Sequence, residues 1–213
     1  MRVNAWTIIG LGLALVGPGV VAWAAQPARG PITPSASAFW LGVFCLLVGG
    51  VAAIARFGER LSPRQTGFAR TSWRSVPLAI IMALGFVFGY FPLAGLLLGH
   101  SATGSFDTGR RALAMLPTWY LSITVVIVAS GEEWLYRAYA IERLAELTGN
   151  TCGAAVVALL MFGIVHLPLW GLGAALSTLM PGAIFTALYL WRRDIVALAM
   201  AHVLIDLHGL VVA

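Results

Sequence analysis

The stretch Leu121-Ser-Ile-Thr-Val-Val-Ile-Val-Ala-Ser-Gly-Glu-Glu-Trp-Leu-Tyr-Arg137 places two adjacent glutamates and an arginine inside an apolar run. An ionisable side chain at the centre of a membrane helix costs about 2.5–3.5 kcal/mol on insertion scales, and such residues usually have a function. We therefore take Glu132 and Glu133 as the first candidates for a functional site. The apolar residues around them predict a membrane-spanning helix.

The composition of the whole chain agrees with a membrane protein. Of its 213 residues, 60% are hydrophobic and 10% are charged, and the mean hydropathy is +0.91. Soluble domains carry about 25% charged residues. The net charge of +5 comes from thirteen arginines and eight acids. We expect these arginines to orient the protein in the bilayer, and we expect no nucleic-acid partner.

Seven segments are apolar enough to cross a bilayer, for which about 20 residues are needed. They are roughly residues 5–25, 37–55, 76–98, 114–141, 152–169, 171–191 and 195–212. The predicted fold class is an all-α polytopic membrane helix bundle. Residues 1–213 form one membrane domain, with the motif-bearing core at 114–213. We expect the first span to be retained, although Ala22-Trp23-Ala24 resembles a signal-peptide cleavage site.

The placement of arginines predicts the orientation. With the N-terminus in the cytoplasm, nine arginines fall on the cytoplasmic side and three on the other, leaving Arg137 aside as intramembrane. The nine are Arg2, Arg56, Arg60, Arg64, Arg70, Arg74, Arg143, Arg192 and Arg193. We therefore expect an integral protein of a bacterial inner membrane with a cytoplasmic N-terminus. The arginine-rich connection 56–75 could be an amphipathic surface helix or a solvated loop.

Several other residues are expected to have no part in a site. His100 and Asp107 lie in a polar, Gly-rich loop. His208 falls near the outer end of the last span, and we expect it at the interface. Cys45 and Cys152 have no CxxC spacing and are predicted to be small core residues. Glu142, Arg143 and Glu146 are predicted to form the solvated end of the fourth span.

The remaining titratable groups are spread over three predicted spans. Glu133 and Arg137 are four residues apart, so they share a helix face and can pair. Glu132 is rotated by about 100° from Glu133 and can face other spans. His166 stands on the fifth span, and a lone helical histidine is usually a packing residue. His202 and Asp206 share one face of the last span, so the three spans together offer matching polar groups.

This set of residues suits hydrolysis by either of two routes. Glu132, His166 and His202 could hold a divalent metal such as zinc, which often has three protein ligands in catalytic sites. Alternatively, Glu132 could act as general base, aided by His166, with His202 and Asp206 stabilising the oxyanion. A structural polar network or a proton pathway uses the same residue types. The residues alone leave a hydrolase and a transporter equally open.

Three short motifs resemble those of a known family. Glu132-Glu133-Trp-Leu-Tyr-Arg137 matches EExxxR, Phe162-Gly-Ile-Val-His166 matches FxxxH, and His202-Val-Leu-Ile-Asp206 matches HxxxN/D. In this order, on successive apolar spans, they resemble the CPBP family of CAAX-processing and bacteriocin-processing intramembrane proteases, also called the Abi family. The resemblance covers about residues 114–213. It implies an endopeptidase that acts on a membrane protein or hydrophobic peptide within the lipid bilayer.

The resemblance also implies a role for each motif residue. Glu132 would activate water with His166, His202 and Asp206 would form the oxyanion site, and Glu133 and Arg137 would support them. The family is described both as a metalloprotease and as a metal-free glutamate protease, so zinc remains an open cofactor. Asp206 stands where many members have Asn, and an ionised Asp accepts hydrogen bonds but cannot donate them.

Two other functions use the same residues. One is a non-catalytic membrane module, such as an immunity or assembly protein. The other is a proton-coupled transporter, for which repeated broken helices would be expected in corresponding halves. The sequence shows no such symmetry, and an intramembrane protease is the favoured hypothesis.

Overall fold

The computed structural model describes residues 4–26, 33–98, 113 and 116–212, and every regular element in these residues is helical. The first half contains α1 (Ala5–Ala24), α2 (Pro34–Ala53), η2 (Ile54–Gly58), η3 (Pro63–Thr66), α3 (Ser75–Gly85), η4 (Phe86–Tyr90) and α4 (Phe91–Leu98). The second half contains α7 (Thr118–Glu133), η6 (Trp134–Ile141), α8 (Glu142–Thr148), α9 (Thr151–Ile164), α10 (Leu167–Arg192) and α11 (Ile195–Val212). The predicted all-α class is confirmed.

Four helical segments are long and apolar enough to cross a membrane, and the last of them is kinked at Gly171, where φ is 83°. They are Ala5–Ala24, Pro34–Gly58, Ser75–Leu97 and Leu167–Arg192. The helices α9 and α11 are also apolar but shorter. The helix that contains α7 carries the charged motif in its middle, which lowers its hydropathy. The fold is therefore a helical membrane bundle, as the composition predicted.

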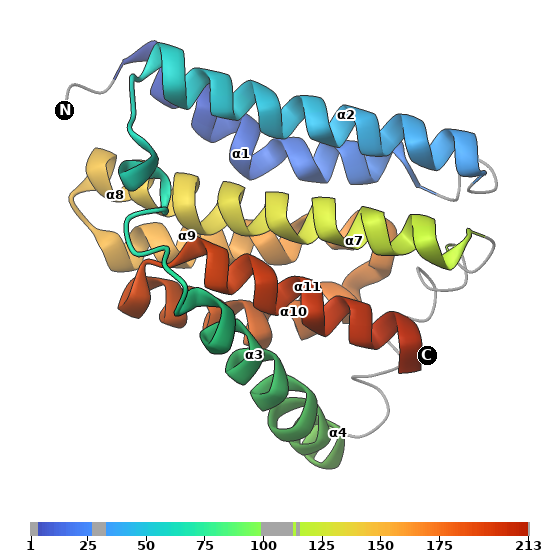
Figure 1. Ribbon diagram of the computed structural model, residues 1–213. Helices are drawn as coiled ribbons and strands as arrows, with labels where there is room; N and C mark the ends of the chain where they lie inside the picture. Colours follow the sequence, from blue (N-terminus) through green and yellow to red (C-terminus); the bar gives the residue numbers. More distant parts are fainter. Residues whose placement is uncertain (1–3, 27–32, 99–112, 114–115, 213) are drawn as a thin grey trace.

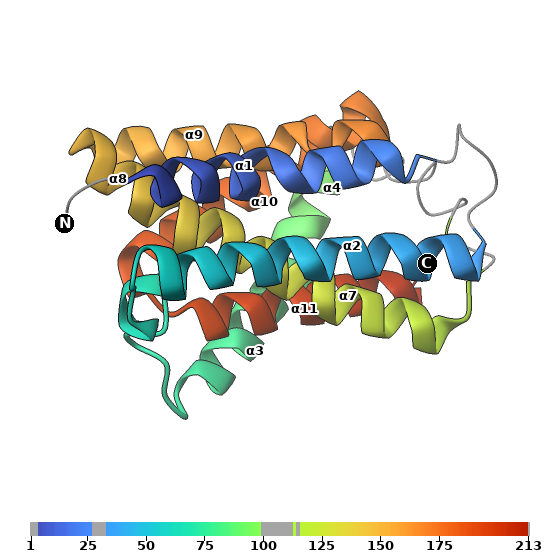
Figure 2. The ribbon, with the colours of Figure 1, turned by 90° about the horizontal axis from the view of Figure 1, so that it is seen from above.

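The helices run along a common long direction, and α7 lies in the middle of the bundle (Figure 1). The pair α1 and α2 packs together on one side of α7, while α11 packs between α7 and α3. Seen from above, α9 lies beside α1, and α10 packs against α9 (Figure 2). The segment α3–α4 diverges from the other helices along its length (Figure 1). The first residues of α1 and the last residues of α11 lie at opposite ends of the bundle.

The centre of the core is the π-helical segment η6, which continues α7 without a break. All its residues from Leu135 to Ile141 are at most 1% exposed. Its apolar residues contribute to both hydrophobic clusters of the molecule, one with α1 and α2 and the other with α3, α10 and α11. Rare π-helical turns are frequent at functional sites, and this one begins directly after the two glutamates.

The limits of two helices differ from those of the predicted spans, and a proline lies near each of these limits. The fourth span begins at Thr118, not at residue 114, because Pro117 occupies the N-cap of α7. The predicted span 152–169 ends at Ile164, where the chain turns through Val165 and His166 into α10. Pro168 is the second residue of α10, in the first helical turn, where the missing backbone N–H of a proline is tolerated.

The arginine-rich connection 56–75 is neither an amphipathic surface helix nor a free loop. It contains one short turn, η3, and Leu61 and Thr66 are buried. Gly67 has φ 92° and its carbonyl accepts a hydrogen bond from the Ile195 amide at 3.2 Å. A Cβ at Gly67 would lie 2.6 Å from the Cβ of Ala138. The connection is therefore packed against η6 and the start of α11.

Two smaller expectations were wrong. Cys45 and Cys152 are free and exposed on their helices, and so are not core residues. Arg143 is only 3% exposed and pairs with Glu146 at 2.8 Å, so the end of the fourth span is not wholly solvated. The reason is that α8 packs against α9 and does not project from the bundle.

Contact between α1 and the centre of the core requires a glycine. A Cβ at Gly10 would lie 2.0 Å from the hydroxyl of Tyr139 and 2.9 Å from its ring. The Tyr139 hydroxyl is held in place by a 2.7 Å hydrogen bond to Glu59. The ring is fully buried.

We therefore expect Gly10→Ala to destabilise the protein by about 1–3 kcal/mol, the usual cost of overpacking. Thermal unfolding in detergent, followed by tryptophan fluorescence, measures the effect. Gly12→Ala is the matched control on the same helix, because no atom lies within 4 Å of its added Cβ. Equal melting temperatures for the two variants would contradict this packing.

Candidate active site

Glu133 is the most deeply buried acid of the three motifs, with 0% exposure. Its Oε1 lies 3.1 Å from a guanidinium nitrogen of Arg137, the ion pair expected from their spacing. The same oxygen lies 2.9 Å from Nδ1 of His202 on α11. Arg137 is also buried and donates to the carbonyl oxygen of Gly182 on α10 at 3.4 Å. Glu133 thus links α7, η6, α11 and, through Arg137, α10.

Phe162 provides an aromatic wall at the centre of this cluster. The Arg137 guanidinium carbon lies 4.1 Å from the centroid of its ring, within cation–π distance. The Phe162 ring also contacts the His166 ring edge-on, with centroids 4.8 Å apart. Phe185 from α10 lies against the ring of His202 at 5.5 Å. These rings surround the charged groups and restrict the orientations of both imidazoles.

His166 is oriented by the end of its helix. Its Nδ1 lies 2.7 Å from the carbonyl oxygen of Phe162, four residues earlier. A carbonyl oxygen can only accept, so Nδ1 carries the proton and donates it. In the neutral ring, Nε2 is then an acceptor. Because α9 ends just before this residue, the side chain of His166 lies at the helix end beside the cavity described below.

His202 and Asp206 lie one turn apart on α11. Nδ1 of His202 faces the Glu133 carboxylate, so it donates its proton there. Nε2 lies 3.6 Å from Oδ2 of Asp206, an ion-pair distance rather than a hydrogen bond. The Asp206 side chain is 44% exposed and that of His202 is 17% exposed. The imidazole is therefore flanked by two carboxyl groups, one buried and one open.

Glu132 differs from its neighbour in its surroundings. It is only partly buried, and among the described residues no hydrogen bond or ion pair holds its carboxyl group. It lines the same cavity as His166, His202 and Asp206. The two adjacent glutamates thus occupy different environments, one locked in a buried cluster and one unconstrained at a cavity wall.

The cavity has a volume of about 1030 Å³ and a mainly apolar lining. That is at the upper end of the 300–1,000 Å³ usual for small-molecule pockets. Its polar groups are concentrated where the three motifs meet, and the remaining walls come from all the long helices. A site of this kind can hold an extended apolar segment with carboxylates and imidazoles at one point along it.

The predicted metal ligands do not assemble into a metal site. Within the described part of the chain, no three His, Cys, Asp or Glu side chains are grouped so that they could hold a metal ion. Glu132, His166 and His202 line one cavity but do not converge on one point with suitable spacing. We therefore derive no step through a metal.

Some residues at the candidate site were not predicted from the sequence, or were predicted to lie outside it. The contact of Glu133 with His202 and the ring of Phe185 were not predicted, since neither follows from a spacing along one helix. His208 is exposed, as expected, but it also lines the far part of the cavity. His100 and Asp107 lie outside the described residues.

Comparison with known proteins identifies the family of this segment. A family model described as type II CAAX prenyl endopeptidase Rce1-like matches residues 114–208. No curated protein and no solved structure matches the chain significantly. The match of residues 114–208 is consistent with the CAAX protease family, in agreement with the resemblance carried by the three motifs. The family supports intramembrane protease activity and implies a membrane-associated protein substrate.

The burial of Glu133 predicts a difference in stability between the two glutamates. Glu133→Ala leaves Arg137 and His202 without their shared partner, and breaking a buried pair costs about 3–5 kcal/mol. Glu132→Ala removes a carboxyl group that bonds to nothing in the described residues, so we expect a change below about 1 kcal/mol. Thermal unfolding of both purified variants measures the difference. A similar loss of stability in both would contradict the division between the two residues.

Proposed function

We propose that this protein is an intramembrane endopeptidase that hydrolyses a peptide bond in a membrane-anchored or hydrophobic protein. The observation that carries the proposal is that Glu132, His166, His202 and Asp206, from three helices, line one cavity. Glu133 is held apart by Arg137 and His202. A carboxylate that is free of partners can take up a proton from water, whereas a buried, paired one cannot do so without breaking its pair.

In this proposal Glu132 is the general base. Water bound between Glu132 and Nε2 of His166 gives a proton to the Glu132 carboxylate as its oxygen attacks the carbonyl carbon. His166 can accept from this water because its Nδ1 is already used by the Phe162 carbonyl. General base catalysis by a positioned side chain contributes about 10²–10⁴-fold in rate.

His202 is proposed to bind the oxyanion of the tetrahedral intermediate. With one proton donated to Glu133, a second proton on Nε2 lets the imidazole donate to the negatively charged oxygen. The carboxylates of Glu133 and Asp206 offset the positive charge on the ring. Asp206 therefore acts through His202, which accounts for an aspartate at a position where an asparagine would donate directly.

Collapse of the intermediate completes the reaction. The bond between the carbonyl carbon and the amide nitrogen breaks, and the proton held by Glu132 passes to the departing nitrogen. The products are a carboxylic acid and an amine, which become a carboxylate and an ammonium group when the proton passes from one to the other, and one water is consumed. The apolar walls of the cavity suit a substrate segment that enters from the lipid bilayer, and a bacterial inner membrane remains the proposed location.

The first test of this proposal is the loss of cleavage when the base is removed. We expect Glu132→Gln and His166→Ala to lower the rate of peptide hydrolysis by at least about 100-fold, with melting temperatures close to that of the wild type. The assay uses protein in liposomes with two fluorogenic peptides, one farnesylated at a C-terminal cysteine and one apolar and unmodified.

A matched control is His208→Ala, which changes an exposed histidine in the far part of the same cavity. Cleavage by Glu132→Gln at the wild-type rate would exclude the proposed chemistry. A cellular phenotype that survives Glu132→Gln would instead favour a non-catalytic membrane module.

A second test concerns the metal. Because the described His and acidic residues form no metal-binding group, we expect hydrolysis to persist after treatment with a strong zinc chelator. The measurement is the cleavage rate with and without chelator, together with the metal content of the purified protein. Activity that is lost on chelation and restored by zinc would show that the metal route is correct.

A further inference from the structure

The cavity occupies only one half of the bundle. It is lined by the last part of α1, the first part of α2, the middle of α3–α4, α7 with the first turn of η6, the end of α9, the first two thirds of α10 and the last part of α11. The lining residues of these segments fall within Pro18–Gln26, Ala36–Phe44, Phe86–Ala94, Leu121–Arg137, Phe162–His166, Leu169–Phe185 and His202–Leu210. Successive long helices run in alternating directions (Figures 1 and 2). The end of one helix and the start of the next therefore lie at the same end of the bundle, and the lining segments lie toward that end.

The open half is the one that contains the end of α11 and the start of α7. Residues near the helix ends there, such as Ala25, Ser37 and Leu210, line the cavity together with the motif residues. Glu132 itself lies near the middle of the continuous helix formed by α7, η6 and α8. The cavity thus extends from the middle of the bundle to one end.

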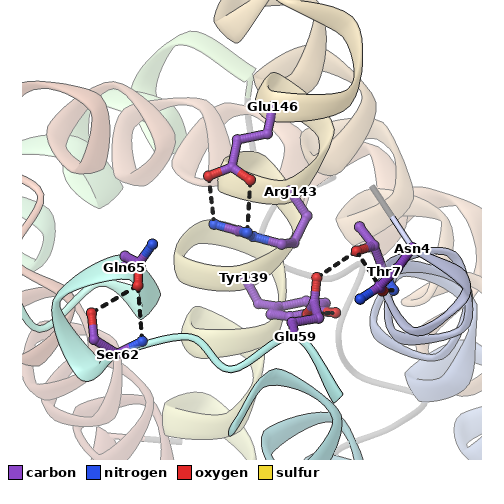
Figure 3. A network of polar contacts seen from close by, with 8 residues as sticks. All are labelled: Asn4, Thr7, Glu59, Ser62, Gln65, Tyr139, Arg143 and Glu146. Carbon is purple, nitrogen blue, oxygen red and sulfur yellow. Dashed lines mark hydrogen bonds and ion pairs between the residues drawn. The ribbon is translucent and has the colours of Figure 1, made fainter. Parts of the chain in front are cut away.

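The other half of the bundle is held together by polar contacts between helices, most of them partly buried. Glu59 accepts hydrogen bonds from the hydroxyls of Thr7 and Tyr139, both at 2.7 Å, and so ties α1 to η6 (Figure 3). Arg143 forms a two-point contact with Glu146 in the same region (Figure 3).

Two further contacts close this half beneath the connection 56–75. Glu142 accepts from the Tyr189 hydroxyl at 2.8 Å and pairs with Arg193. The Ser75 hydroxyl donates to the buried Asp194 carboxylate at 2.7 Å, joining α3 to the start of α11. Together with the fully buried residues Leu135 and Ala138–Ile141 of η6, these contacts lie between this end and the motif residues, and none of the residues that form them lines the cavity.

The closed end is also the arginine-rich end. It contains the connection with Arg56, Arg60, Arg64, Arg70 and Arg74, together with Arg143, Arg192 and Arg193. Arginines in short connections are retained on the cytoplasmic side of a membrane. The open end of the cavity therefore faces the opposite side.

We infer that the site opens to the outer face of the membrane and takes a substrate segment that reaches it from there. The direction of the opening is a property of the fold alone. The identification of the bound segment as a substrate rests on the proposed protease function. The substrate class is an exported, membrane-anchored polypeptide whose cleaved segment enters the membrane from its outer side. A lipidated C-terminus on the cytoplasmic face would meet the closed half of the bundle.

Accessibility of single cysteines tests the direction without any activity assay. Cys45 and Cys152 are first changed to alanine, and Val128→Cys is then introduced into the cavity wall one turn before Glu132. Ala36→Cys reports on the wide end of the cavity, and Arg64→Cys reports on the arginine-rich connection. Right-side-out and inside-out vesicles from a bacterial expression host are treated with a charged, membrane-impermeant thiosulfonate. Remaining thiols are then counted with a maleimide dye in detergent.

We expect the reagent to block Val128→Cys and Ala36→Cys at least about tenfold faster in right-side-out vesicles than in inside-out vesicles. Arg64→Cys should show the reverse. Faster blocking of Val128→Cys in inside-out vesicles, or blocking in neither preparation, would overturn the inference. If the labelling agrees but no peptide is cleaved, the opening stands and the proposed protease function fails.

Discussion

The rest of the site depends on the carboxyl group of Glu133, which is shared by Arg137 and His202. Two charges taken out of water are costly unless they are paired with good geometry. Here one carboxylate oxygen lies 3.1 Å from a guanidinium nitrogen and 2.9 Å from an imidazole nitrogen, while the second carboxylate oxygen has no hydrogen-bond partner among the described residues. This joins the end of α7 to α11, and Arg137 extends the link to the Gly182 carbonyl on α10. The positions of the other motif residues follow from this junction.

The junction also explains why two adjacent glutamates have different roles. Consecutive residues on a helix differ by about 100° in direction, so only one of them can face the Arg137 and His202 side. Glu133 takes that position, and Glu132 faces the cavity with no partner in the described residues. Packing by Phe162 and Phe185 keeps the imidazoles in place without using any further polar group. The site thus combines a buried cluster of Glu133, Arg137 and His202 with the carboxyl group of Glu132, which has no hydrogen bond or ion pair among the described residues.

The molecule has two different ends as a consequence of where its polar residues lie. At the arginine-rich end, the partly buried Glu59 and Glu142 and the buried Asp194 accept hydrogen bonds from hydroxyl groups of other helices, and these bonds hold the helices together. At the other end the helix surfaces are apolar and separate around a cavity. Apolar side chains can line a cavity without leaving polar groups unsatisfied, whereas buried polar groups require partners. The two halves differ in composition, and the cavity with the motif residues therefore extends to the apolar end and not to the arginine-rich end.

Much of this protein follows from the sequence, because helical periodicity and the length of a membrane span act locally. The helical membrane bundle, the pairing of Glu133 with Arg137 and the three motifs could be predicted from residues near one another in the chain, whereas four of the seven predicted spans are long and apolar enough to cross a membrane in the described residues. The ends of the spans at Pro117 and Pro168 were misplaced, since a proline acts on the backbone of its neighbours in a way that hydropathy does not register. The contact of Glu133 with His202, the burial of Arg143 and the one-sided cavity depend on how helices distant in sequence meet. Only the tertiary structure decided these, because the distance between two helices is set by the packing of all the side chains between them.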